Sequence, residues 1–244
     1  MTRYRSALPM YDLPEMRKET TGYWSQILLG MKSRGAEPLV DFYHPKTDDE
    51  SDELLRHPRL LLSQTCWGPI SCGVAPELHI LAQPDFSPFA GGMGPLYRSA
   101  IIAMGRGPNL TPPKTGDANL PIEAMIGKRL AFNDRVSLSG YLSVTADMTA
   151  ATGNRKAFYS QGLHSGGHRH SVQMVASGEA DIAAIDCKTW DLVQRFDVAA
   201  KNVRVIGWTQ ARKGLPLVCS PTLDNALKSI LTDTLLDLGA YPAT

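Results

Sequence analysis

Ser137, Ser139 and Gly140 are the residues of this chain whose types and spacing best suit the binding of a small anion. They stand in "NDRVSLSGYL" (133–142), after the apolar run "GKRLAF" and before a segment of helical composition. A helix start leaves backbone N–H groups without internal partners and carries the positive end of the helix dipole, so hydroxyl residues there hold an anion together with those amides. Serine is also a preferred helix cap that needs no ligand. Both interpretations stay open on this stretch alone.

A second candidate anion loop lies in "HSGGHRHSVQMVASGEADIAAID" (164–186). The pattern predicts a helix over about 169–177 that ends at Gly178, followed by an apolar strand that ends at Asp186. His168 can donate to a phosphate-like oxygen, and Arg169 adds charge. The alternative is that "SGG" is a flexible turn with exposed histidines. A zinc site at His164, His168 and His170 has less support than either interpretation, because no acidic or thiol ligand stands at a useful spacing beside these histidines.

Asp186 closes a run of mostly apolar residues, and a carboxylate in that place needs a partner or an open sheet edge. It could accept hydrogen bonds from an amine or hydroxyl of a ligand. It could equally cap the helix that "CKTWDLVQRF" (187–196) predicts. The two roles share the same geometry at the end of a strand, so both remain open.

Nucleophilic catalysis fits the sequence poorly. The chain has no GxSxG elbow, no P-loop and no GxGxxG after a strand, and no cofactor or metal is expected. Cys66 has no evident base nearby in sequence, although a distant histidine could pair with it in space. The spacing of Cys66 and Cys72 would allow a loop disulfide, whereas Cys187 and Cys219 suit buried free thiols. A binding protein is therefore the first hypothesis, and a cytoplasmic enzyme using Cys66 or His168 is an alternative.

The charge balance excludes broad classes of partner. Lys plus Arg number 25 and Asp plus Glu 24, which gives no support for a nucleic-acid or acidic-membrane partner. No apolar run approaches the length that spans a bilayer, so direct membrane insertion is not expected. The first residues, "MTRYRSALPMYDLPE", lack the apolar core of a secretory signal peptide. The protein either stays in the cytoplasm or has lost a leader.

Short apolar segments alternate with amphipathic ones, which predicts an α/β fold with βα units around mainly parallel sheets. A Pro- and Gly-rich connector, "GRGPNLTPPKTGDANLP" (105–121), precedes a fresh βα rhythm. We predict two lobes with a ligand cleft between them. The first lobe spans 1–103 and resumes at 212–244, and the second, inserted lobe spans 104–211. Ligands bind beyond the carboxyl ends of strands in such folds, so the loops there are the candidates.

These segments together resemble the phosphate/phosphonate-type substrate-binding proteins of ABC importers, which have the type II periplasmic binding protein fold. The resemblance rests on the order and spacing of "ALPMYDLPE", "LLLSQTC", "YRSAIIAM", "GKRLAFNDRVSLSGYL", "SGGHRHSVQMVASGEADIAAID" and "RVIGWTQARKGLPLVCS". It covers nearly the whole chain. It implies two lobes that close over a small oxyanion, and it implies a periplasmic location, although the sequence shows no signal peptide.

The resemblance also implies site residues. The family's Ser-Thr-Ser-Gly run matches Ser137-Leu138-Ser139-Gly140, where Leu138 lacks the middle hydroxyl. A lost hydrogen bond to a charged oxygen is worth roughly 1.5–3 kcal/mol. The Thr-Gly-Ser-His loop matches 165–168, with Gly167 in place of the serine. Ligand-binding residues are thus expected at Tyr11, Thr65, Trp67, Tyr97, Ser137, Leu138, Ser139, Gly140, Tyr141, Ser165, Gly167, His168 and Asp186.

The function that follows is a non-catalytic solute-binding protein for a phosphate, a phosphonate or a similar anion, with an ABC transporter permease as a potential partner. A rival is a protein of the same fold that binds a neutral or cationic metabolite, such as a pyrimidine precursor of thiamine. The two lost hydroxyls and the indole of Trp67, which stands where the family has Gly-Tyr-Pro, would suit that rival.

Overall fold

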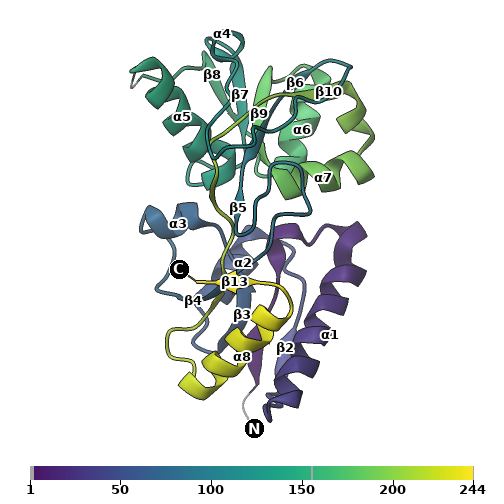
Figure 1. Ribbon diagram of the computed structural model, residues 1–244, viewed down its shortest axis with the longest axis vertical. Helices are drawn as coiled ribbons and strands as arrows, with labels where there is room; N and C mark the ends of the chain where they lie inside the picture. Colours follow the sequence, from purple (N-terminus) through teal and green to yellow (C-terminus); the bar gives the residue numbers. More distant parts are fainter. Residues whose placement is uncertain (1–2, 155, 244) are drawn as a thin grey trace. The chain divides into compact units, whose positions relative to one another are not determined.

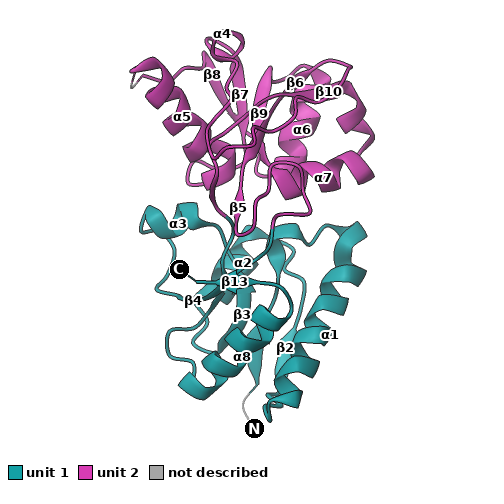
Figure 2. Cartoon of the chain, in the orientation of Figure 1, with its two compact units in different colours: residues 1–85, 214–244 teal, residues 86–213 magenta. Residues whose placement is uncertain are grey.

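The computed structural model describes residues 3–154 and 156–243 and divides into two compact units (Figures 1 and 2). Unit 1 comprises residues 1–85 and 214–244, and unit 2 comprises residues 86–213. Each unit has its own sheet and its own helices, which confirms the predicted α/β class.

Unit 1 is built on a six-stranded sheet with the order β13-β4-β12-β3-β1-β2. Its strands are β1 (Tyr4–Ser6), β2 (Val40–Phe42), β3 (Leu60–Gln64), β4 (His79–Gln83), β12 (Leu217–Cys219) and β13 (Tyr241–Pro242). Its helices are α1 (Arg17–Ser33), α2 (Asp48–Leu55), α3 (Trp67–Ser71) and α8 (Asn225–Asp237), with 3-10 turns η1 (Pro9–Tyr11) and η2 (Pro14–Met16).

Two long helices cover the sheet of unit 1, as Figure 1 shows for α1 and α8. In the sequence, Trp24, Ile27 and Met31 recur at helical spacing, which predicts one apolar face. In α1 these three residues are buried and share one core with Leu231 and Leu235 of α8. Pro14 does not enter α1 but belongs to the short η2 turn before it. The helical spacing therefore predicted the buried face correctly, whereas the helix begins at Arg17, later than a cap at Asp12 with Pro14 in the first turn would place it.

Unit 2 is built on a five-stranded sheet with the order β10-β6-β9-β7-β8 and a two-stranded sheet of β11 and β5. Its strands are β5 (Leu96–Tyr97), β6 (Ser99–Met104), β7 (Arg129–Phe132), β8 (Gln161–His164), β9 (Ile182–Asp186), β10 (Val203–Trp208) and β11 (Arg212–Lys213). Its helices are α4 (Ile122–Met125), α5 (Ser143–Thr152), α6 (His168–Ser177) and α7 (Cys187–Phe196), with a π-helical turn η3 (Leu138–Leu142) and a 3-10 turn η4 (Val198–Asn202).

The division into units differs from the predicted lobes mainly at the first boundary. The prediction placed 1–103 in the first lobe, whereas unit 2 begins at residue 86. The reason is β6, which pairs antiparallel with both β9 and β10 and is therefore part of the sheet of unit 2. The second boundary lies at 213/214 in the structure and was expected at 211/212.

Both main sheets are mixed, not mainly parallel as expected. In unit 2, β7 pairs parallel with β8 and β9, and the antiparallel pairs come from β6 and β10. In unit 1, β12 and β13 run antiparallel to their neighbours. The parallel strands β7 and β9 point their carboxyl ends toward the same edge of the sheet. The turn η3 follows β7 at this edge, and Asp186 is the last residue of β9.

Candidate functional site

The serine turn η3 follows β7 and leads straight into α5. The Ser137 hydroxyl accepts a hydrogen bond from the Gly140 N–H at 3.1 Å and lies 3.4 Å from the Ser139 hydroxyl. Ser137 is therefore an N-cap, the role that serine commonly has at such a position. The amides of Leu138 and Ser139 fall in the first turn, where a helix supplies no internal acceptor.

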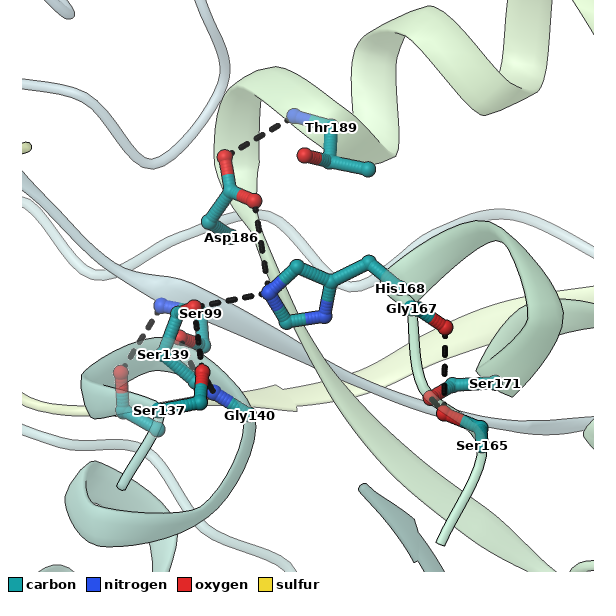
Figure 3. A network of polar contacts seen from close by, with 11 residues as sticks. Ser99, Ser137, Ser139, Gly140, Ser165, Gly167, His168, Ser171, Asp186 and Thr189 are labelled. Carbon is teal, nitrogen blue, oxygen red and sulfur yellow. Dashed lines mark hydrogen bonds and ion pairs between the residues drawn. The ribbon is translucent and has the colours of Figure 1, made fainter. Parts of the chain in front are cut away.

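His168, the first residue of α6, contacts the serine turn directly (Figure 3). Its Nε2 atom lies 2.7 Å from the Ser139 hydroxyl. The hydroxyl of Ser99, at the start of β6, donates to the Ser139 carbonyl oxygen at 2.9 Å. The structure thus brings together the two helix starts that the sequence singled out, one after β7 and one after β8.

The start of α6 differs from the serine turn because its N-cap, Gly167, has no side chain and makes no side-chain cap. The first amides of a helix without a side-chain cap are the natural partners of an anion. The Ser165 hydroxyl donates to the Gly167 carbonyl at 3.1 Å and lies 2.6 Å from the Ser171 hydroxyl. Ser165 therefore stabilises the loop around Gly167, a role that the resemblance did not suggest.

Asp186 caps the next helix, as one of the two sequence interpretations held. Its Oδ1 accepts a hydrogen bond from the Thr189 N–H at 2.9 Å, and its Oδ2 lies 3.6 Å from His168 Nε2. The serine and the carboxylate therefore approach the same imidazole nitrogen, as Figure 3 shows. A Ser-His-Asp triad needs the two on opposite nitrogens, so this geometry is not a hydrolytic triad.

Burial sets the charge state of the site. The His168 side chain is 13% exposed, and desolvation lowers its pKa, an effect that the nearby Asp186 carboxylate opposes. Desolvation likewise lowers the pKa of Lys188, and attraction to Asp186 opposes that shift. The imidazole is thus held neutral near pH 7. A neutral imidazole beside a hydroxyl and helix amides can hold an oxyanion by hydrogen bonds.

The two predicted tyrosines of unit 2 have different surroundings. Tyr97 is buried in β5, where it packs against Phe86 with ring centroids 5.6 Å apart. The Tyr141 hydroxyl lies 2.9 Å from the Tyr159 hydroxyl and accepts a hydrogen bond from Arg135 at 3.1 Å. Tyr141 thus belongs to an aromatic group beside the serine turn. Its role as a ligand contact stays a prediction.

The remaining predicted residues belong to unit 1. Tyr11 ends η1, Thr65 follows β3, and Trp67 begins α3, so all three follow the carboxyl ends of β1 and β3. Tyr11 and Thr65 are buried, and Trp67 is half-buried. These positions match the strand-end rule from which they were predicted. Contact of these residues with a ligand stays a prediction.

The cysteines offer no disulfide and no metal site in the part of the chain that the structure describes. None of the four cysteines forms a disulfide, so Cys66 and Cys72 are not joined. Burial raises the pKa of Cys219 to about 12 and that of Cys187 further still, which keeps both as unreactive thiols. Within residues 3–154 and 156–243, no group of three or more His, Cys, Asp or Glu side chains could hold a metal ion.

Ser99, Ser171 and Arg98 are residues of this region that sequence reasoning missed. Ser99 lies directly opposite Asp186 in the β6–β9 pair, and Cys187 N–H donates to the Arg98 carbonyl at 3.1 Å. The sequence gives one local sign of Arg98 and Ser99, because both polar residues directly precede the apolar run "AIIAM" (100–104). The antiparallel pairing of β6 with β9 places Ser99 opposite Asp186. It joins segments more than 80 residues apart in sequence, so no local pattern reveals it.

The fold is shared with solved binding proteins. The chain is similar to PhnD1 from Prochlorococcus marinus, solved in complex with methylphosphonate, with 15% identity, coverage of 97% of this chain and 84% of that chain, and a TM-score of 0.69. It is also similar to a binding protein component of an ABC phosphonate transporter from Pseudomonas aeruginosa, with 17% identity, coverage of 98% and 80%, and a TM-score of 0.66. A comparison with curated protein sequences finds no match.

Another similar structure is XAC2383 from Xanthomonas citri bound to chloride ion, with 14% identity, coverage of 96% and 83%, and a TM-score of 0.64. Together with the two sheet-containing units, these neighbours define the architecture as a type II periplasmic binding protein fold, as predicted.

Residues 78–243 match the model of a family described as "ABC transporter, phosphonate, periplasmic substrate-binding protein". The chain belongs to this family. The family consists of binding proteins of transporters and is not an enzyme class. In the described residues, no helix has both the length and the apolar character needed to cross a membrane.

Proposed function

We propose that this protein captures a small oxyanion, such as phosphate or a phosphonate, for an ABC importer. The observation that carries the proposal is the 2.7 Å contact between Ser139 and His168, which joins two helix starts at one point of unit 2. Each helix start contributes amides and the positive end of its dipole, and both favour negative charge. The solved binding of methylphosphonate by the similar PhnD1 supports the same ligand class.

The ligand contacts proposed in unit 2 fall into two sets. From the serine turn they are the amides of Leu138 and Ser139 and the Ser139 hydroxyl. From α6 they are the amide and imidazole of His168, at the start of a helix that has no side-chain cap. Tyr11, Thr65, Trp67 and Tyr97 are proposed as further contacts on the strength of the family resemblance. Ser137 and Asp186 act chiefly as caps in this proposal.

The family suggests the cellular setting. Its members are periplasmic substrate-binding proteins of ABC transporters, so we propose an ABC permease as the partner and the periplasm as the location. Release of the ligand to a permease requires reversible binding without covalent change. The non-triad arrangement of Ser139, His168 and Asp186 is consistent with such a role.

Isothermal titration calorimetry with phosphate, methylphosphonate and 2-aminoethylphosphonate tests the proposal. We expect saturable binding of at least one of these anions by the wild-type protein and markedly weaker binding by Ser139→Ala, because a hydrogen bond to a charged group is worth roughly 1.5–3 kcal/mol. Ser51→Ala, on α2 of unit 1, is a matched control that should bind as the wild type does.

A thermal-shift assay extends the test to the rival ligand class, since a bound ligand raises the melting temperature by mass action. Stabilisation by thiamine pyrimidine precursors, without any response to the anions from a folded sample, would replace the oxyanion by a neutral or cationic metabolite. A response to the anions alone agrees with the proposal.

A further inference from the structure

Arg98 is a buried cation of unit 2 with no carboxylate partner in the described part of the chain. Only 3% of the residue is exposed. One terminal nitrogen, Nη1, donates to the Gly91 carbonyl at 3.3 Å, and the other, Nη2, donates to the Thr115 carbonyl. The Nε atom is buried and has no hydrogen-bond partner. The guanidinium is thus held by neutral acceptors alone.

A charge in this position is expensive to bury. Charged groups in protein interiors are normally paired, because burial without a counter-charge carries a large desolvation penalty. Burial lowers the pKa of Arg98, and attraction to the exposed Asp117 carboxylate only partly opposes this shift. An arginine nevertheless stays protonated in proteins, so the positive charge persists. By contrast, the partly buried Arg212 of the same unit forms an ion pair with Asp147, whose side chain is buried.

The backbone ties Arg98 to the candidate anion site. Its carbonyl accepts the Cys187 N–H at 3.1 Å, and the next residue, Ser99, donates its hydroxyl to the Ser139 carbonyl at 2.9 Å. Ser99 also lies directly opposite Asp186 in the sheet. Arg98 therefore directly precedes Ser99, the residue of β6 that contacts the serine turn and pairs with Asp186 at the end of β9.

The other ionisable groups here nearly cancel. His168 is neutral, and the charges of Asp186 and Lys188 attract each other. Arg169 of α6 is paired with Asp197. Among the described residues, no carboxylate lies within ion-pair distance of Arg98. Its positive charge is therefore not offset by a direct partner.

We propose that Arg98 supplies the counter-charge of the bound oxyanion and is a specificity-determining residue that acts through its charge without touching the ligand. This inference rests on the proposed function and deepens it, because it requires the ligand to be negatively charged. The anion would supply the missing negative charge in a medium of low dielectric, where the attraction between charges extends over longer distances than in water. A neutral ligand would leave the buried charge uncompensated.

Calorimetric titration with methylphosphonate of four variants beside the wild type tests this. Arg98→Gln removes the charge but keeps a side-chain donor, and we expect its association constant to fall about tenfold, the order of effect that one charge exerts at an effective dielectric constant of about 20. Arg98→Lys keeps the charge and should lose much less. Arg195→Gln, an exposed arginine on the last turn of α7, is the matched charge control and should bind as the wild type does.

Asp117→Asn is the variant that protects the test against misfolding, because it alters an exposed side chain and leaves Arg98 in place. Removal of this attracting carboxylate should raise the affinity, by about twofold given solvent screening. Equal affinities of Arg98→Gln and Arg195→Gln for methylphosphonate would overturn the proposal. Equal losses of affinity in Arg98→Lys and Arg98→Gln would also overturn it. So would an unchanged affinity in Asp117→Asn. Failure of the wild type itself to bind phosphate or methylphosphonate would instead overturn the proposed function and, with it, the role of Arg98.

Discussion

Gly140 is the residue of the serine turn whose replacement tests the local geometry most sharply. A Cβ atom at this position would overlap Asn133 Oδ1 and come within 3.1 Å of both Asn133 Cγ and His168 Cε1. The Asn133 oxygen can swing away, since it has no hydrogen-bond partner among the described residues. The imidazole cannot yield as easily, because its Nε2 atom, which is bonded to Cε1, is held by the contact with Ser139.

The magnitude follows from two opposing effects. Overpacking of a tight site costs about 1–3 kcal/mol. Alanine in a helical turn gains about 1 kcal/mol over glycine. Gly140→Ala should therefore lower the free energy of unfolding by about 1 kcal/mol, with an upper limit of about 2 kcal/mol. It should also weaken methylphosphonate binding, because the added methyl group displaces His168 from Ser139.

Urea unfolding followed by circular dichroism measures the first effect, and calorimetry measures the second. The double variant Asn133→Ala/Gly140→Ala removes the colliding amide and should recover part of the lost stability, which a double-mutant cycle reports as coupling between the two sites. The matched control Gly22→Ala lies on α1 with open space around its Cβ position and should be neutral or stabilising. A fully stable Gly140→Ala, or a cycle without coupling, would refute this packing of the serine turn.

Three further predictions follow from ion pairs and burial. Asp147→Asn should destabilise the protein by about 2 kcal/mol in thermal or urea unfolding, because it removes the carboxylate that accepts hydrogen bonds from the partly buried Arg212 guanidinium, whereas an effect below about 0.5 kcal/mol would contradict the ion pair. His168→Gln should change how stability depends on pH: burial lowers the folded-state pKa of His168, so its contribution is present above pH 6.5 and is lost as pH falls below that value, and identical slopes between pH 8 and pH 5 in both proteins would contradict this. Hydrogen bonds from Arg129 lower the pKa of Asp181 to about 2, so its stabilising contribution is present above the ordinary pKa and is lost as pH falls toward 2; NMR titration of the carboxyl group checks the value, and an ordinary pKa would contradict it.

Local signals predicted much of the fold. The periodicity of Trp24, Ile27 and Met31 predicted the buried face of α1, and Gly178 was correctly expected to end α6, where its positive φ of 80° suits glycine. The apolar run before Asp186 gave β9. These features depend on residues close in sequence, so that a single chain reveals them.

Pairing between distant segments could not be predicted in the same way. The strand β6 was assigned to the first lobe because nothing local reveals its antiparallel partners, β9 and β10. The edge strand β8 was missed since "QGLH" has little apolar alternation. The short strands β5 and β11 depend on each other across more than 100 residues.

The candidate site shows the same limit. The serine turn and the start of α6 were both chosen from sequence, and they do meet at Ser139 and His168. The sequence left open whether Ser137 and Asp186 were caps or ligand contacts, and the structure gives each a backbone N–H to cap. The hydrogen bonds of Ser165 and Ser99 depend on loop geometry and strand pairing, and no spacing rule reports these.

Chemical-shift perturbation of the backbone amides by methylphosphonate tests the central claim most directly. In 1H–15N NMR spectra of the wild-type protein, the account predicts large downfield shifts for the amides of Leu138, Ser139 and His168, since an N–H that donates to an anion is deshielded. The capped amide of Gly140 should respond less, because Ser137 already accepts its hydrogen bond. Saturable binding that leaves these first three amides unmoved would contradict the account.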